Sequence, residues 1–321
     1  MISSLHIYQA SGSDPFENLA REQVLLEQGP ADGVILYLWQ NQNTVVIGRN
    51  QNAYKECRTS LLEEEGGKLA RRLSGGGAVF HDLGNLNFTF LLPRADFDVR
   101  RQLEVICTAC RELGIPAEIS GRNDLHAEGQ KFSGNAFYKS GKSAYHHGTL
   151  LIAGNMEKLS RYLTPSKAKL ESKGVASVRS RVVNLREFVP GLTVEDLSEA
   201  LAAAFRNVYA APLTRMEVPH DAVLQPLVET YRSWEWNYGK DLPFTCSAAH
   251  RFPWGSVEVT MDIRQGVIRN PGVFTDAMEW ELAERLRSAI DGCRYCHEAL
   301  FNALTEFPDA EALCRILLEA Q

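Results

Sequence analysis

The densest group of residues able to do chemistry lies between residues 70 and 90. It contains, in order, Arg71, Arg72, Ser74, Gly75, Gly76 and Gly77. Successive glycines let the backbone approach a ligand closely, and their N–H groups can converge on an anion. A neighbouring guanidinium adds charge and a planar fork of donors. The stretch is typical of a nucleotide-phosphate site, although a tight turn between strands, with solvated arginines, also accounts for an isolated triple glycine.

Two familiar phosphate-binding motifs do not account for these glycines. The Walker motif requires a Lys-Ser or Lys-Thr pair after the glycines, and none follows. The dinucleotide-binding motif requires a helix there, whereas residues 78–80 are β-forming and residues 86–90 alternate as a half-buried strand does. The sequence therefore predicts a glycine loop between strands.

A second polar segment follows at residues 120–136. It contains Asn123 and Asp124, and Lys131 within a G-x-K-x-S-G pattern. A lysine can act as a point charge between a phosphate and a carbonyl oxygen. Asp124 could bind a ribose, an exocyclic amine or Mg²⁺. The alternatives are a solvated surface lysine and an ordinary turn carboxylate.

The adjacent pair His146-His147 precedes an apolar strand. Adjacent strand residues point to opposite faces, so the pair is a poor metal site, and one of the two is expected to line a pocket or make a local hydrogen bond. The spacing of residues names no Ser-His-Asp set and no G-x-S-x-G elbow. Composition and spacing alone indicate only an enzyme that uses a nucleotide.

The bulk composition excludes several classes of protein. A length of 321 residues favours about two domains. The net charge of -6 gives no electrostatic case for nucleic acid, and no apolar run is long enough to cross a membrane. The first residues lack a secretion signal, so a cytoplasmic protein is expected. Seven cysteines, an odd number, argue against a disulfide framework, and the haem-like Cys293–His297 motif is interpreted as coincidence in a helical region.

The elements that must position these residues follow from periodicity and turn residues. We expect a hairpin turn at residues 40–43 between two strands, a basic loop at 165–184, and a linker at 239–250. Two strands and two amphipathic helices should then complete the chain. The remaining expected elements are strands at 5–8, 33–39 and 44–48 and helices at 16–25, 100–114 and 195–209.

Six motifs, in the same order and at similar spacing, resemble those of bacterial lipoate–protein ligase A. They are ARRLSGGGAVFHDLGN, SGRNDL, QKFSGNAF, HHGTLL, KGVASVRSRVVNL and SWEWNYG. FPWGSVEV and GVFTD resemble that family's accessory domain. The resemblance implies the biotin/lipoate ligase fold: α/β (α+β), a mixed sheet flanked by helices, with a small α/β C-terminal domain. We predict a catalytic domain at 1–244 and an accessory domain at 250–321.

The resemblance implies an ATP-dependent ligase that uses Mg²⁺ and forms an acyl-adenylate. Lipoate and ATP would give lipoyl-AMP and pyrophosphate, and a lysine of a lipoyl domain would then accept the lipoyl group. The implied partners are E2 subunits of 2-oxoacid dehydrogenases and the glycine cleavage H protein, with no nucleic acid and no membrane.

The resemblance also assigns roles to residues. Lys131 is the implied catalytic residue and Asp124 an implied Mg²⁺ ligand. Trp39 and His147, together with Val79, are the implied lining of the lipoyl pocket. The basic loop, through Lys173, Val178 and Arg179, would close over the adenylate. The implied ATP and lipoyl-AMP contacts are Arg72, Gly75, Gly76, Gly77, Ala78, Val79, Phe80, Asn123, Asp124 and Lys131.

Two positions depart from the expected pattern: Gln23 stands where an acidic residue is expected, and Gln130 replaces a basic one. Alternative functions are a lipoyltransferase that uses preformed lipoyl-AMP and a non-catalytic lipoate-binding module. An octanoyltransferase of the cysteine type is disfavoured, because Thr149 follows the histidines and no cysteine lies between Cys110 and Cys246. The glycine-loop pattern disfavours a biotin ligase.

Overall fold

The computed structural model describes residues 2–121, 124–164, 182–216, 221–239, 243–279 and 281–320. The chain forms two compact units. Unit 1 consists of Met1–Arg49 and Gly67–Arg232, and unit 2 of Asn50–Gly66 and Ser233–Gln321. This division by packing differs from the linear domains expected from the sequence, because residues 50–66 group with the C-terminal part of the chain.

Unit 1 is built on a six-stranded mixed sheet of order β10-β11-β6-β2-β1-β12. β1 is parallel to β2 and β12, whereas β6, β11 and β10 continue the sheet in antiparallel pairs. The mixed sheet confirms the predicted fold class. The strands are β1 (Ser4–Gln9), β2 (Gly33–Trp39), β6 (Asn85–Pro93), β10 (Asn135–Ser140), β11 (Ser143–Leu151) and β12 (Leu213–Arg215).

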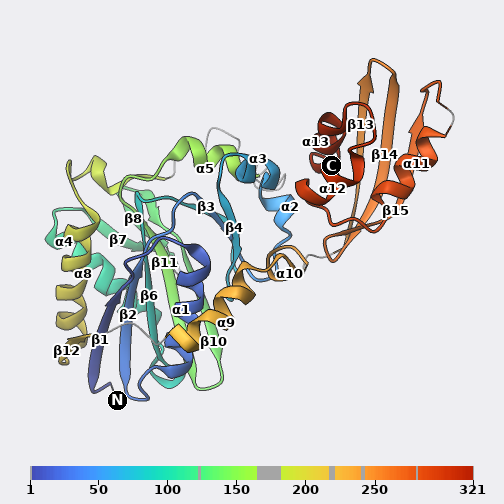
Figure 1. The fold of residues 1–321 in the computed structure, drawn as a ribbon. Helices are drawn as coiled ribbons and strands as arrows, with labels where there is room; N and C mark the ends of the chain where they lie inside the picture. Colours follow the sequence, from blue (N-terminus) through green and yellow to red (C-terminus); the bar gives the residue numbers. More distant parts are fainter. Residues whose placement is uncertain are drawn as a thin grey trace. The chain divides into compact units, whose positions relative to one another are not determined.

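Helices flank this sheet on both sides (Figure 1). Figure 1 shows α4 and α8 on one side of the sheet and α1 and α9 on the other. α1 begins where Asp14 accepts hydrogen bonds from the N–H groups of Phe16 and Glu17, with Pro15 in the first turn. The four helices are α1 (Pro15–Gln28), α4 (Val99–Glu112), α8 (Val194–Tyr209) and α9 (Asp221–Arg232).

The alternating residues of β6 divide the interior of unit 1 into two environments. Phe88 and Phe90 belong to the apolar core that includes α4 and α8. Asn87 and Thr89 point the other way, and Thr89 reaches Glu22 of α1. The alternation of polar and apolar residues was predicted correctly. The prediction that one face of the strand is exposed is wrong, since both faces of β6 are buried. The polar face is covered by α1 and lined with buried polar side chains.

Two three-stranded sheets complete unit 1, of order β4-β3-β5 and β7-β8-β9. The hairpin predicted at residues 40–43 is wrong, because β2 and β3 belong to different sheets and the segment crosses between them. The elements are β3 (Thr44–Ile47), β4 (Lys68–Arg71), β5 (Val79–His81), β7 (Ala117–Ser120), β8 (Asp124–Ala127), β9 (Gln130–Ser133), α5 (Met156–Tyr162) and the 3-10 turns Arg94–Asp96 and Leu185–Glu187.

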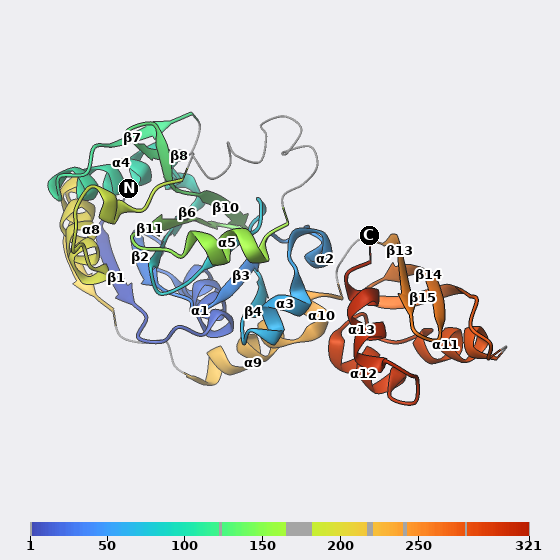
Figure 2. The ribbon, with the colours of Figure 1, turned by 90° about the horizontal axis from the view of Figure 1, so that it is seen from above.

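Unit 2 contains an antiparallel sheet of order β13-β14-β15. Alternate residues of β14 are buried against α11, α12 and α13, which makes three closing helices where two were expected. Figure 2 shows these helices on one side of the sheet. The elements are α2 (Ala53–Glu56), α3 (Thr59–Glu64), α10 (Trp234–Asn237), β13 (Phe244–Phe252), β14 (Gly255–Arg264), β15 (Val267–Thr275), α11 (Leu282–Ile290), α12 (His297–Leu304) and α13 (Ala310–Leu318).

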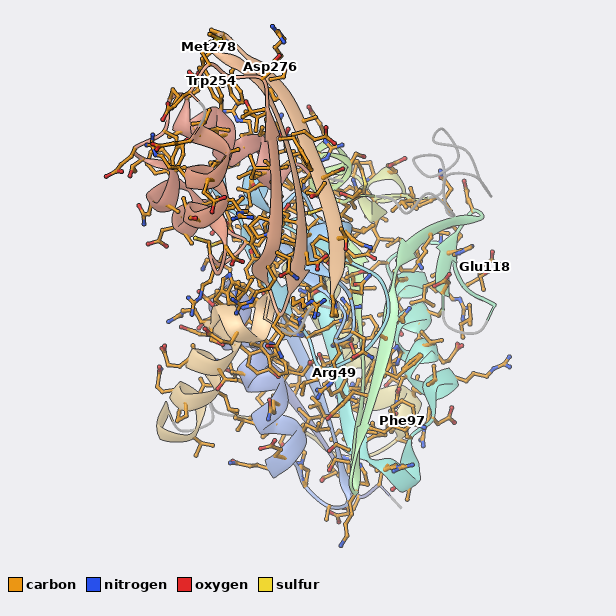
Figure 3. The ribbon with its side chains drawn as sticks, turned by 90° about the vertical axis from the view of Figure 1, so that its right-hand side faces the viewer. Arg49, Phe97, Glu118, Trp254, Asp276 and Met278 are labelled. Carbon is orange, nitrogen blue, oxygen red and sulfur yellow. The ribbon has the colours of Figure 1, made fainter. Side chains whose placement is uncertain are left out.

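Residues 50–66 join unit 2 through aromatic contacts. The Tyr54 hydroxyl donates to the Tyr295 carbonyl at 2.6 Å, and Tyr238 donates to Glu63 at 2.5 Å. At the other end of this unit, Trp254, Asp276 and Met278 lie close together in Figure 3.

All seven cysteines are free thiols, as expected. Cys293 and Cys296 lie between α11 and α12, and the region is less continuously helical than predicted. No helix in the described part of the chain is long and apolar enough to span a membrane.

Candidate active site

The predicted glycine loop lies between β4 and β5 of unit 1. The N–H of Arg49, which is labelled in Figure 3, donates to the Ser74 carbonyl at 2.9 Å and ties the loop to the end of β3. Gly48 permits this packing, because a Cβ there would lie 2.3 Å from the Gly76 carbonyl oxygen. Gly76 itself has a φ of 90°, which favours glycine. Two of the glycines in this region are therefore required by the backbone.

Arg72 is 5% exposed, and its guanidinium binds the loop itself. Nη2 donates to the carbonyls of Gly75 at 2.7 Å and Gly77 at 2.8 Å, Nη1 donates to Val46 at 3.1 Å, and Nε donates to the Ser74 hydroxyl at 3.0 Å. Burial lowers the pKa of Arg72 to about 10, a shift that the charges of Tyr145 and Glu22 oppose. The side chain stays charged and clamps the loop from one side.

This clamp also fixes the loop's N–H groups. The peptides are trans, so the carbonyl and the N–H of one peptide point in opposite directions. With the Gly75 and Gly77 carbonyls held by Arg72, the N–H groups of Gly76 and Ala78 face away from it. A loop held in this way presents donors to an anion.

A cavity of about 280 Å³ lies beside the loop. Its lining comprises the glycine loop and Lys131, which are exposed or part-exposed, and an inner wall of buried side chains that includes Trp39, His81 and His147. Its lining consists of Leu19, Trp39, Val46, Arg72, Gly76, Gly77, Ala78, Val79, His81, Asn87, Lys131, Gly134, Asn135, Ala136, His147, Gly148 and Thr149.

Behind the inner wall, two chains of hydrogen bonds converge on the buried carboxylate of Glu22, which is 2% exposed. Thr89 donates to Glu22 Oε1 at 2.7 Å, and the indole N–H of Trp39 donates to Thr89 at 3.0 Å. His147 Nδ1 donates to the same oxygen at 2.8 Å, and His147 Nε2 lies 2.7 Å from the Ser74 hydroxyl. The carboxylate thus fixes the positions of both Trp39 and His147.

His81 borders the inner end of the cavity as a neutral ring. Burial lowers its pKa to about 3, with further lowering by Arg72 and His147. Its Nδ1 lies 3.2 Å from the Asn41 amide nitrogen, which donates to it, because the Asn41 oxygen already accepts from Asn18. The ring proton is therefore on Nε2.

Lys131 lies at the glycine-loop end of the cavity. Its Nζ forms an ion pair with Asp124 at 2.7 Å, and both side chains are more than a third exposed. The ammonium also lies 4.0 Å from the position of a Cβ on Gly134, whose N–H donates to Thr149 at 3.1 Å. A part-exposed cation with a carboxylate partner beside a donor loop can offset the charge of a phosphate.

The structure brings most of the predicted site residues together. Eight line the cavity: Trp39, Arg72, Gly76, Gly77, Ala78, Val79, Lys131 and His147. Asp124 contacts Lys131, whereas Gly75 is a carbonyl partner of Arg72 and the Phe80 side chain is buried 5.4 Å from the Tyr162 ring. Asn123, Lys173, Val178 and Arg179 lie outside the described residues.

Sequence reasoning missed the buried acid. An acid was expected at position 23, but the side-chain oxygen of Gln23 accepts a hydrogen bond from the Tyr231 hydroxyl. The acid is the neighbouring Glu22, which bonds to His147. Helical periodicity could have indicated Glu22, because it lies three residues after Leu19 and so on the same face of the helix, and Leu19 lines the cavity. The half-buried strand expected at residues 86–90 would leave Asn87 and Thr89 in solvent, whereas Asn87 lines the cavity and Thr89 donates to Glu22 behind it.

Among the described residues, no group of three His, Cys, Asp or Glu side chains gathers around a common point. Mg²⁺ needs no such cage, because it is usually held by one or two carboxylates, substrate phosphates and water. Asp124, part-exposed and beside Lys131, fits a single-carboxylate site of this kind.

Comparison with known proteins places the chain in a family. A model of the lipoyl protein ligase A/B catalytic domain matches residues 14–206, and a model of the bacterial lipoate protein ligase C-terminus matches residues 242–317. The chain belongs to the lipoate–protein ligase family. The predicted family and accessory domain are thereby confirmed.

Solved structures agree with this assignment. P. falciparum LipL1, crystallised with lipoate, is 27% identical, with a TM-score of 0.64 over 98% of this chain and 99% of its own. A lipoate-protein ligase A bound with ATP is 26% identical, with a TM-score of 0.65 over 75% and 100%. The bi-partite ligase of Thermoplasma acidophilum, described with its E2 lipoyl domain, is 26% identical, with a TM-score of 0.64 over 75% and 97%.

Proposed function

We propose that the protein is an ATP-dependent lipoate–protein ligase that forms lipoyl-AMP in the cavity of unit 1 and then transfers the lipoyl group to a lysine of a lipoyl domain. The observation that carries the proposal is the meeting of a clamped glycine loop, Lys131 and a buried inner wall that includes Trp39 and His147 in one cavity. Related proteins were crystallised with lipoate and with ATP, which supports both substrates.

In the first step the carboxylate of lipoate attacks the α-phosphorus of ATP and pyrophosphate leaves. The lipoyl chain would lie against Trp39, Val79 and His147, and the phosphates against the loop. Lys131 and the N–H of Gly76 would offset the charge that develops on the α-phosphate oxygens. Lys131 acts here by electrostatics and forms no covalent bond to the substrate.

Mg²⁺, when bound through Asp124 and the phosphates, would neutralise part of the charge of the triphosphate. Asp124 would then exchange its ion pair with Lys131 for the metal, which leaves the ammonium available to the substrate. We also propose that Asn123 contributes to nucleotide binding, and that Lys173, Val178 and Arg179 of the basic loop cover the adenylate.

In the second step the ε-amino group of an acceptor lysine attacks the acyl carbonyl of lipoyl-AMP and AMP leaves. Lys131 would remain near that carbonyl and stabilise the oxyanion. The acceptors proposed are E2 subunits and the glycine cleavage H protein, and the first is supported by the related ligase described with its E2 lipoyl domain. A cytoplasmic location fits these acceptors.

The test is pyrophosphate release by the full-length protein with lipoate and MgATP, before any acceptor is added. We expect release that depends on both lipoate and ATP. Absence of release, together with transfer from synthetic lipoyl-AMP, would instead make the protein a lipoyltransferase. Absence of both activities in a protein that still binds lipoate would identify a non-catalytic lipoate-binding module.

A further inference from the structure

The wall of the acyl pocket and the glycine loop are joined by a continuous set of buried hydrogen bonds. It runs from Glu22 through His147 and Ser74 to Arg72, with distances of 2.8, 2.7 and 3.0 Å. Arg72 then holds the carbonyls of Gly75 and Gly77. Every member is at most 6% exposed, so water does not substitute readily for a missing link.

The direction of each bond follows from its end point. The Glu22 carboxylate can only accept, so His147 carries a proton on Nδ1. When Nδ1 carries the only ring proton, Nε2 accepts the proton of the Ser74 hydroxyl. The Ser74 oxygen is then free to accept from Arg72 Nε, which orients the guanidinium toward the loop. Each link thus fixes the next.

Ser74, His147 and Glu22 share the connectivity of a hydrolytic triad, but Ser74 is fully buried and does not line the cavity. A hydroxyl that no substrate reaches is not a nucleophile. Its remaining effect is on Arg72, which is held by both the serine oxygen and the loop carbonyls.

We infer that Ser74 and His147, anchored on Glu22, are positioning residues for the nucleotide: they orient Arg72, and through Arg72 they hold the glycine loop in its anion-binding form. His147 would therefore serve both substrates. It lines the acyl pocket directly and affects nucleotide affinity through the loop, even when no acid is bound. The inference rests on the proposed function, in that the loop binds ATP.

The test uses two variants, each of which removes one hydrogen bond of the chain. Ser74→Ala removes the link to Arg72. His147→Asn keeps a donor near the position of Nδ1 and removes the group that meets Ser74. The dissociation constant of MgATP is measured by calorimetry on the full-length chain without lipoate, and the melting temperature is measured in parallel. Ser198→Ala is the matched control, because Ser198 is also buried but bonds only within α8.

We expect each relay variant to bind MgATP about fivefold to tenfold more weakly, which corresponds to the loss of one ordinary intramolecular hydrogen bond. The double variant should be no weaker than the weaker single variant, since both break the same chain. Ser198→Ala should bind as the wild type does.

Unchanged MgATP affinity in both folded variants, or a change confined to the KM for lipoate, would overturn the inference. If Ser74→Ala does not fold, His147→Asn alone decides. A wild-type protein that binds no MgATP would instead refute the proposed function, which distinguishes the two failures.

Discussion

His146 and His147 are neighbours on β11, yet their side chains enter opposite faces of the sheet of unit 1. His147 bonds to Glu22 and Ser74 beside the cavity. His146 bonds to Gln102 of α4 at 2.9 Å and to Asn135 at 2.9 Å, next to the rings of Phe88 and Phe137. One face of the strand therefore carries a polar relay to the site, and the other carries polar groups within the packed core.

The difference shows that burial alone does not identify a functional histidine. Burial lowers the pKa of His146 to about 3, as it does that of His81, although His146 contacts no part of the glycine loop. What separates His147 is connectivity, because its partners reach both a buried carboxylate and a loop built for an anion.

The largest effect expected on the cavity side comes from Lys131→Ala. We predict that lipoate activation falls by at least about a hundredfold, because the variant loses the charge that stabilises the transition state. Pyrophosphate release is the measurement, with circular dichroism to confirm folding. Lys139→Ala is the control, since Lys139 is an exposed lysine of the same unit whose ammonium lies over the Phe97 ring. Undiminished turnover in Lys131→Ala would remove the role assigned to this residue.

A second prediction compares the two histidines directly. His147→Asn should lower kcat/KM for lipoate activation about tenfold, through both the acyl wall and the relay. His146→Asn should lower the free energy of unfolding by about 2 kcal/mol and change kcat/KM by about twofold or less. Steady-state kinetics and urea unfolding measure the two quantities. Equal losses of activity in the two variants would contradict the separation of the faces.

A third prediction concerns the pH dependence of stability. Because the pKa values of His81 and His146 are about 3 in the folded protein, against an ordinary value near 6.5, the unfolded chain takes up their protons first as pH falls. Their contribution to stability is complete above pH 6.5 and is lost toward pH 3, at about 1.4 kcal/mol per pH unit for each histidine. In His146→Asn the free energy of unfolding should therefore change less steeply with pH, by about 1.4 kcal/mol per pH unit.

Urea unfolding at several pH values between 4 and 7 measures this slope, with His250→Gln as a control at an exposed histidine. An identical slope in the wild type and His146→Asn would show that His146 is protonated in the folded protein.

Much of the fold could be predicted from the sequence where local pattern and tertiary role coincide. The strand after the glycines, the long helices α4 and α8, and the gathering of Lys131, Trp39 and His147 near the loop were all indicated by periodicity or by the family motifs. Prediction failed where a polar residue is buried for a tertiary reason. Thr89 and Asn87 look like a solvent face until α1 is placed over them, and Glu22 is one position from the acid expected.

The role of Arg72 also depended on three-dimensional information. An arginine before three glycines suggests a direct phosphate ligand, and sequence cannot show that carbonyls of the loop already occupy its donors. Likewise, the grouping of residues 50–66 with unit 2 depends on contacts such as that of Tyr54 with Tyr295, more than two hundred positions apart.

The measurement that tests the central claim most directly is lipoate-dependent exchange of labelled pyrophosphate into ATP, catalysed by the wild-type protein without an acceptor. If the cavity joins lipoate and ATP into a mixed anhydride, reversal of that step must return the label to ATP only when lipoate is present. We predict such exchange, its loss in Lys131→Ala, and its persistence in Lys139→Ala. Absence of exchange in a folded protein that binds both lipoate and MgATP would contradict the account.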